Sequence, residues 1–242
     1  MDPFELLVEA HRPAIKPALA KLVGILHAQK ARYVIGGANA LSLYVRPRMT
    51  VDVDAFVDPV RKNEIDKAFA AEFELVSIGM FHSKFKHADV EIDILYAGAH
   101  AEDFAVASAR DAVILGTPVK AASPEALLWL YLASAKEQNF VDALNLLRSN
   151  PQLDVGLVRK QLERHQPELL PKLEKMLTTA REPEVSYEES RAQRASAARA
   201  GRARSRPPSA PRKAAASARA RSPGSRARAA RPARRRPSRQ RG

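Results

Sequence analysis

Apolar and polar residues alternate in two stretches of the chain, and this alternation predicts two half-buried β-strands. In the first, residues 51–57, Asp52 and Asp54 share one face of the predicted strand, while valine and alanine side chains occupy the other. In the second, Glu91 and Asp93 oppose three apolar side chains in the same way. We therefore expect each strand to bury one face and to present a pair of carboxylates on the other.

Shorter apolar runs and helical spacing predict the elements around these two strands. A short β-prone run at residues 33–35 ends at a pair of glycines. Pro13 and Pro17 predict a break between two N-terminal helices within residues 3–29. Further helices are expected at residues 38–43, 61–71 and 101–109, and further strands at residues 73–78, 80–85, 89–95 and 112–115. The sequence thus predicts an α/β (α+β) fold in which a small mixed sheet carries helices on one face.

The region after residue 116 has the pattern of a helical bundle. Ser123, Pro124 and Glu125 combine a cap residue, a proline at the first helical position and an acid in the first turn, which is typical of a helix start. The helix that follows is almost continuously apolar and is expected to be buried. Further helices are expected near residues 140–147, 154–165 and 167–179. We divide the chain into an α/β domain with N-terminal helices at residues 1–116, a helical bundle at residues 117–182 and a tail at residues 183–242.

Charge separates the tail from the rest of the chain. The 242 residues carry a net charge of +13, but residues 1–185 hold 22 Lys+Arg against 25 Asp+Glu, whereas residues 186–242 hold 18 against 2. The tail is rich in Arg, Ala, Ser and Pro and lacks the apolar side chains that would offset its ordering entropy, so we expect it to be disordered. Its arginines favour sequence-independent binding to nucleic-acid phosphates. The alternative is that the tail is compositional drift without a selected partner.

Several classes of protein are excluded or disfavoured by composition. The chain has no cysteine, which excludes disulfides and thiolate catalysis and removes the usual ligands of structural zinc. No apolar run approaches the roughly 18 residues that would indicate a membrane-spanning helix. The first ten residues are acidic and do not resemble a secretory leader. We expect a cytoplasmic protein without a membrane partner.

The paired acids and the paired glycines are the residues that indicate chemistry. Asp52 and Asp54 stand two positions apart on a strand, where they repel each other unless they share a cation, and Asp93 supplies a third carboxylate. Mg²⁺ favours such oxygen ligands. Gly36 and Gly37 allow a phosphate to approach main-chain N–H groups at a helix start. The alternatives are a solvated acidic strand face and an ordinary strand-to-helix turn; the six histidines show no metal-ligand spacing and are assigned no role.

With these residues in view, residues 30–150 resemble the nucleotidyltransferases of the DNA polymerase β superfamily. The resemblance is greatest to the minimal nucleotidyltransferases and to the abortive-infection toxins of toxin–antitoxin systems. Their signature is a hydrophobic residue followed by Gly-Gly or Gly-Ser, then Asp-x-Asp on the next strand, then a third Asp on a later strand. The matching residues are Ile35-Gly36-Gly37, Asp52-Val53-Asp54 and Asp93, with Arg48-Met49-Thr50-Val51-Asp52 matching an Arg-x-Thr/Ser-x-Asp run.

The resemblance implies a polymerase β-like fold and a set of roles. Asp52, Asp54 and Asp93 would bind Mg²⁺ and carry catalysis. The nucleoside triphosphate would be bound by Gly36, Gly37, Arg48, Thr50 and Lys136. A nucleoside monophosphate would pass to an acceptor hydroxyl on RNA, protein or a small molecule, and a toxin of this kind would have a cognate antitoxin.

The chain departs from the toxin branch in its helical region. Tyr131 and Asn139 stand where that branch often has a Lys and an Asp, while Lys136 and Asp142 match its basic residue and its second Asp. Two other interpretations follow from the residues. One is a catalytically inactive protein of this fold that binds nucleic acid through residues 186–242, and the other is an enzyme that modifies a cationic small molecule such as an aminoglycoside.

Overall fold

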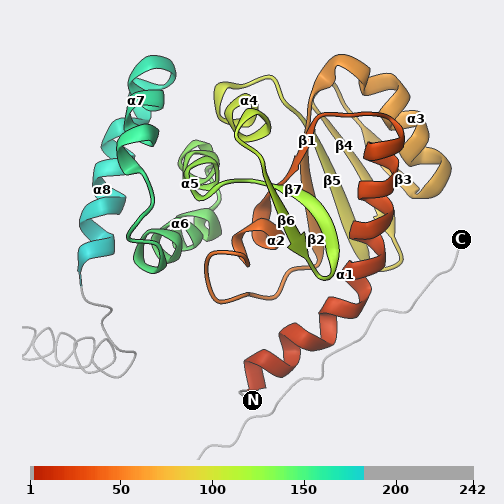
Figure 1. Ribbon diagram of the computed structural model, residues 1–242, viewed down its shortest axis with the longest axis horizontal. Helices are drawn as coiled ribbons and strands as arrows, with labels where there is room; N and C mark the ends of the chain where they lie inside the picture. Colours follow the sequence, from red (N-terminus) through yellow and green to blue (C-terminus); the bar gives the residue numbers. More distant parts are fainter. Residues whose placement is uncertain (1–2, 183–242) are drawn as a thin grey trace, which may run out of the picture. The chain divides into compact units, whose positions relative to one another are not determined.

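A computed structural model of the chain describes residues 3–182, with side chains from Ala14 onward (Figure 1). The tail predicted to be disordered lies outside the described residues. The strands of the described part are β1 (Tyr33–Ile35), β2 (Asp52–Val57), β3 (Glu74–Ile78), β4 (His82–His87), β5 (Val90–Tyr96), β6 (Arg110–Ile114) and β7 (Thr117–Ala121). They form one seven-stranded sheet of order β3-β4-β5-β2-β1-β7-β6.

The sheet is mixed, which confirms the predicted fold class. β2 and β5 run parallel, while β3, β4 and β5 form an antiparallel meander. β1 pairs antiparallel with β2 and parallel with β7, and β6 and β7 form a hairpin. The sequence interpretation missed β7, which lies in the range expected to be helical. Its inward residues are Thr117, Val119 and Ala121, and Pro118 within this short run weakens the strand signal.

Two helices cover one face of the sheet. They are α1 (Pro3–Ala28) and α3 (Lys62–Glu72), whose apolar side chains share a core with the inward residues of β2, β4 and β5. The expected break in α1 was wrong, because one continuous helix contains both Pro13 and Pro17. The two prolines stand four residues apart, so the missing backbone bonds fall on the same side of the helix. Such a loss bends a helix rather than ending it, and Figure 1 shows α1 bending along its length.

The other helices form a second core on the opposite face, next to β1 and β2. They are α2 (Gly37–Leu41), α4 (His100–Ala107), α5 (Pro124–Ala133), α6 (Glu137–Ser149), α7 (Val155–His165) and α8 (Leu170–Arg181). Ser123 caps α5 as predicted, since its hydroxyl accepts a hydrogen bond of 3.2 Å from the Ala126 N–H. α5 is almost entirely buried, with Trp129 1% exposed. Among residues 3–182, no helix combines the length and hydrophobicity needed to cross a bilayer.

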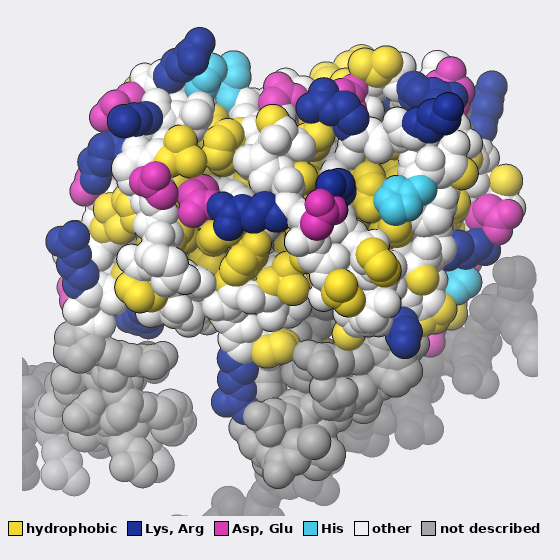
Figure 2. Space-filling view, in the orientation of Figure 1, with side chains coloured by type: hydrophobic (Ala, Val, Ile, Leu, Met, Phe, Trp, Pro, Cys, Tyr) yellow, Lys and Arg dark blue, Asp and Glu magenta, His cyan; other side chains and the backbone are white. Residues whose placement is uncertain are grey.

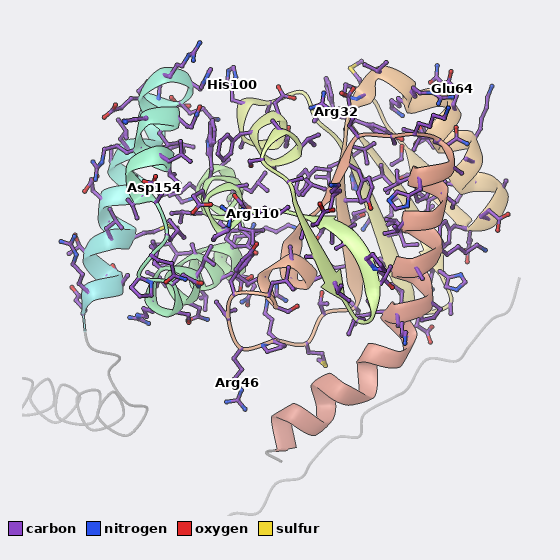
Figure 3. All side chains as sticks on the ribbon, in the orientation of Figure 1. Arg32, Arg46, Glu64, His100, Arg110 and Asp154 are labelled. Carbon is purple, nitrogen blue, oxygen red and sulfur yellow. The ribbon has the colours of Figure 1, made fainter. Side chains whose placement is uncertain are left out.

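A buried carboxylate joins the sheet to these helices. Glu125, in the first turn of α5, accepts a hydrogen bond of 3.2 Å from Arg110 on β6 and one of 3.3 Å from the main-chain N–H of Asp154, which caps α7. Figure 3 labels Arg110 and Asp154. The outer edge of the sheet and the start of α7 are therefore fixed to the same residue of α5.

Candidate active site

Three carboxylates meet on the face of β2 and β5 opposite α1 and α3. The parallel pairing places Asp54 directly beside Asp93 and Asp52 beside Glu91. One oxygen atom from each of Asp52, Asp54 and Asp93 lies within 4.8 Å of the other two. The structure therefore brings together the three acids that the sequence placed on two separate strands.

The glycine pair fits closely against the acidic strand. Gly37 has a positive φ of 55°, and a Cβ atom there would lie 1.9 Å from Asp54 Oδ2. A Cβ atom at Gly36 would lie 2.4 Å from a ring carbon of Phe56. The Gly36 N–H donates to the main-chain oxygen of Asp54 at 3.0 Å. Only glycine allows the turn before α2 to approach β2 this closely.

Two polar side chains hold the start of β2. The Thr50 hydroxyl donates a hydrogen bond to Asp52 Oδ1. The buried Asn39 amide of α2 donates to the main-chain oxygen of Asp52 at 2.8 Å. Thr50 therefore orients a carboxylate of the cluster, and its predicted contact with nucleotide stays a prediction. Asn39 was missed, although a polar residue within a short apolar helix is a signal for a specific partner.

Arg48 is bound by a buried acid of α6. Its Nε atom lies 3.2 Å from both oxygens of Asp142, and Nη2 lies 3.0 Å from Oδ2. Gln138 donates a further bond of 2.9 Å to Asp142. The charge of Arg48 therefore stays beside the acid cluster, while part of its N–H fork serves to tie the loop before β2 to α6.

Asp93 has two partners on β4 that the sequence interpretation missed. His82 Nε2 lies 2.9 Å from Asp93 Oδ1, and Lys84 Nζ lies 3.5 Å from the same oxygen. Lys84 also donates to Glu91 at 2.8 Å, and this bond raises the pKa of Lys84. Strand alternation could have found this arrangement, because His82 and Lys84 share a face of β4 and Lys84 pairs with Asp93.

A cavity of about 470 Å³ opens beside the acids. The predicted site residues on its wall are Gly37, Arg48, Asp52, Asp54 and Lys136. Tyr131 also lines it, and its hydroxyl donates to the main-chain oxygen of Gly37 at 3.3 Å. Burial raises the pKa of Tyr131, so the phenol stays neutral at ordinary pH. Tyr131 thus supports the glycine turn from the position where the toxin branch often has a lysine.

The electrostatics of the cluster centre on Asp54. Burial, followed by the charges of Asp52 and Asp93, raises the pKa of Asp54 from 3.8 to about 6, while Lys136 and Arg48 act in the opposite direction. The ionised carboxylates are therefore mutually unfavourable, and a cation between them would relieve the repulsion. Carboxylate oxygens at this separation are the donors that Mg²⁺ prefers. The residues present fit such an ion.

Comparisons with known proteins bear on the fold alone. No protein-family model matches the chain, and no curated protein matches its sequence. The solution structure of the antibiotic-resistance factor ANT(2'')-Ia is 17% identical, with a TM-score of 0.48, over 68% of this chain and 97% of that one. The lincosamide antibiotic adenylyltransferase LnuA with lincomycin bound is 15% identical, with a TM-score of 0.41, over 53% and 93%.

The nucleotidyltransferase-like protein from Paracoccidioides brasiliensis is 20% identical, with a TM-score of 0.41, over 67% of this chain and 93% of that one. Nucleotidyltransferases thus recur among the structural neighbours, at identities too low to carry over an activity. An activity for this chain depends on the chemistry of its own acids, glycines and cavity.

Proposed function

We propose that the chain is a Mg²⁺-dependent nucleotidyltransferase that moves a nucleoside monophosphate from a nucleoside triphosphate to an acceptor hydroxyl. The observation that carries this proposal is the meeting of Asp52, Asp54 and Asp93 within 4.8 Å of one another, beside a cavity of about 470 Å³. Three neighbouring carboxylates do not stabilise the fold by themselves, because each one raises the free energy of ionising the other two. A site for divalent cations explains the arrangement.

Each side chain then has a role that follows from its position. Asp52 and Asp54 hold the ions, with Thr50 fixing the orientation of Asp52. Gly37 lines the cavity beside Asp54, where the triphosphate would lie, and Lys136 and Arg48 supply positive charge on the cavity wall. Bound Mg²⁺ would supply activation of the attacking oxygen and stabilisation of the leaving pyrophosphate.

The transfer itself is a displacement at the α-phosphorus of the triphosphate. A bond forms between the acceptor oxygen and the α-phosphorus, and the bond from that phosphorus to the bridging oxygen breaks. Pyrophosphate leaves with the electron pair of the broken bond. We assign Asp93 the proton of the acceptor hydroxyl, because its carboxylate lies directly beside Asp54 in the acid cluster.

The finer parts of the proposal concern the acceptor and the setting. We propose RNA as the acceptor and a toxin-like role with a cognate antitoxin, in the cytoplasm, where nucleoside triphosphates and Mg²⁺ are abundant. What supports these parts is the resemblance of the motif residues. We also keep the proposed division into an α/β domain at residues 1–116, a helical bundle at residues 117–182 and a tail at residues 183–242.

A transfer assay tests the activity directly. The purified chain is incubated with each α-labelled nucleoside triphosphate, with Mg²⁺ or Mn²⁺, and with bulk RNA, protein or small cationic acceptors. We expect label to pass to an acceptor and to be lost in the variant Asp52→Asn/Asp54→Asn. The matched control is Asp89→Asn, which changes an exposed acid in the turn before β5 and should leave transfer intact. Equal transfer by the double variant would contradict the proposal.

A second candidate function is suggested by the partners of Asp93. Lys84 forms an ion pair with this acid and His82 contacts the same oxygen, as expected of a protein of this fold that has lost catalysis and binds nucleic acid through residues 186–242. Figure 2 supports the assignment of nucleic-acid binding to the tail. On the face shown, basic and acidic side chains of the described residues are interspersed, without a broad basic area. RNA binding without transfer under any metal would favour this function.

A further inference from the structure

β3 is an edge strand with an unusual amount of exposed apolar surface. It pairs only with β4 among the described strands (Figure 1), and all five of its residues are exposed. Five large hydrophobic side chains lie on this strand and on the turn that follows it, with exposures from 48% for Leu75 to 77% for Met80; the others are Val76, Ile78 and Phe81. We call these five residues the β3 patch.

The two edges of the sheet differ in a way that singles out the β3 patch. On the opposite edge, β6 carries Arg110 and Asp111, which form ion pairs with Glu125 and Lys120. Charged side chains on an edge strand discourage pairing with another chain. β3 has one charge, Glu74 at its first residue, and residues 75–81 have none. Beyond Glu74, the β3 edge therefore lacks the charged side chains that the β6 edge has.

We propose that the β3 patch joins two copies of this chain by antiparallel pairing of β3 with β3. The register of β3 on β4 makes this pairing self-complementary. Leu75 lies opposite Phe85 and Ile78 lies opposite Ser83, while a bulge places Val76 between them. Phe85 and Ser83 are both fully buried on the helix-covered face, so Leu75 and Ile78 point to that same face.

In the proposed dimer, a two-fold axis passes between Val76 and Ser77 and relates the β3 strands of the two copies. Leu75 of one copy then lies opposite Ile78 of the second copy, and both pairs extend the core under α3. Glu74 lies opposite Gly79, so no like charges meet across the joint. An extended segment of another protein would need to supply this complementarity by chance, whereas a second copy has it by symmetry.

The area of the β3 patch near the free edge approaches what a dimer needs. Phe81 lies beside β5, since its main-chain oxygen accepts from the Tyr96 N–H, and the other four side chains expose on the order of 400 Å² in each chain. Two copies would bury about 800 Å² of this apolar surface, and the paired main chains add to it toward the lower limit of specific interfaces. The two acid clusters would lie on the same face of the joined sheet, roughly 25 Å apart, since five strand spacings separate the two β5 strands.

Sedimentation of the full chain tests the proposal. The protein is freed of nucleic acid and measured in high salt, at concentrations from roughly 1 to 100 µM. We expect a monomer–dimer equilibrium, and Ile78→Lys should weaken it at least 100-fold, because a charge would be buried at the joint. Val113→Lys is the matched control, since Val113 is 62% exposed on the β6 edge and its substitution should leave the equilibrium unchanged.

A second variant and a local measurement complete the test. Val76→Lys replaces an exposed bulge residue and should also weaken the dimer. This variant provides the test if Ile78→Lys does not fold. Hydrogen exchange at the amides of β3 should slow as the concentration of the wild-type chain rises. A chain that is monomeric throughout this range, or a dimer that neither lysine variant weakens, would overturn the proposal.

Discussion

At the scale of single residues, the backbone of Gly37 and the carboxylate of Asp54 compete for the same space. A Cβ atom at residue 37 would lie 1.9 Å from Asp54 Oδ2, and the positive φ of Gly37 adds strain to any larger residue. The substitution Gly37→Ala should therefore displace Asp54 and lower the free energy of unfolding by roughly 1–3 kcal/mol. Nucleotidyl transfer should fall about 100-fold, because the reacting groups are misplaced.

The control for this substitution is Gly24→Ala. Gly24 lies in α1, and a Cβ atom there would meet nothing within 4 Å. Alanine is the better helix former, so this variant should be up to about 1 kcal/mol more stable than the wild type. Urea unfolding and transfer rates of both variants make the comparison. Normal transfer by Gly37→Ala would show that the close approach of the glycine turn has no role in activity.

Asp54 gives a second prediction, on the dependence of stability on pH. Burial and two neighbouring acids raise its pKa in the folded chain from 3.8 to about 6. The folded state therefore binds the proton more tightly than the unfolded state, and this contribution to stability is lost as pH rises from about 4 to about 6. The variant Asp54→Asn cannot lose a proton there. In metal-free buffer it should be more stable than the wild type by about 1–3 kcal/mol at pH 8 and equally stable below pH 4.

Unfolding by urea across this pH range, with a chelator present, measures the difference. Mg²⁺ should then restore stability to the wild type and have less effect on Asp54→Asn, because the variant lacks one ligand. Asp89→Asn, at an exposed position, is the control and should follow the wild-type curve. A gap between Asp54→Asn and the wild type that stays constant from pH 4 to pH 8 would contradict the assignment.

At the scale of secondary-structure elements, the ion pair of Arg48 and Asp142 joins the loop before β2 to α6. Asp142 is buried and Arg48 is partly exposed, so removing Arg48 leaves an unpaired buried charge. Arg48→Ala should cost about 2–4 kcal/mol of unfolding free energy. The double variant Arg48→Ala/Asp142→Asn should recover much of this loss, because the buried residue is then neutral. A double-mutant cycle by urea unfolding measures the coupling, and a coupling near zero would contradict a structural role for the pair.

Prediction from sequence succeeded where local periodicity decides the outcome. Strand alternation was enough to place Asp52, Asp54 and Asp93 on matching faces, and their pairing follows once β2 and β5 are neighbours. The cap at Ser123 is equally local. The continuity of α1 was missed because the stabilisation from its packing against the sheet outweighs the cost of two prolines within the helix.

The contacts that sequence could not provide are those between distant elements. Asp142 and Arg48 are 94 residues apart, and Tyr131 and Gly37 are also 94 residues apart. Neither pair has a periodic pattern that would predict it. His100 and His165 are a further example: their rings lie 4.4 Å apart, and His100, labelled in Figure 3, stands at the start of α4. Spacing along the chain gave no signal for this contact.

At the scale of the whole molecule, the chain combines a slightly acidic part with a strongly basic one. Residues 1–185 carry a net charge of −3 and residues 186–242 a net charge of +16. Phosphate polymers should therefore be attracted by the tail and repelled by the acid cluster, unless cations occupy that cluster. Nucleic-acid affinity and transfer activity are then separable properties, which depend on different parts of the sequence.

Removing the tail tests this separation. Binding of bulk RNA to the full chain should weaken steeply with salt, because the 18 basic residues of the tail release counterions from the RNA. A chain of residues 1–185 should bind RNA far more weakly and with a shallower salt dependence. A tail of the same composition in scrambled order should restore binding, since evenly spread arginines with no aromatic residue after Tyr187 read no sequence. If the shortened chain binds as tightly and with the same salt dependence, RNA is held instead by the folded residues, and the acid cluster must then be saturated with cations when it binds.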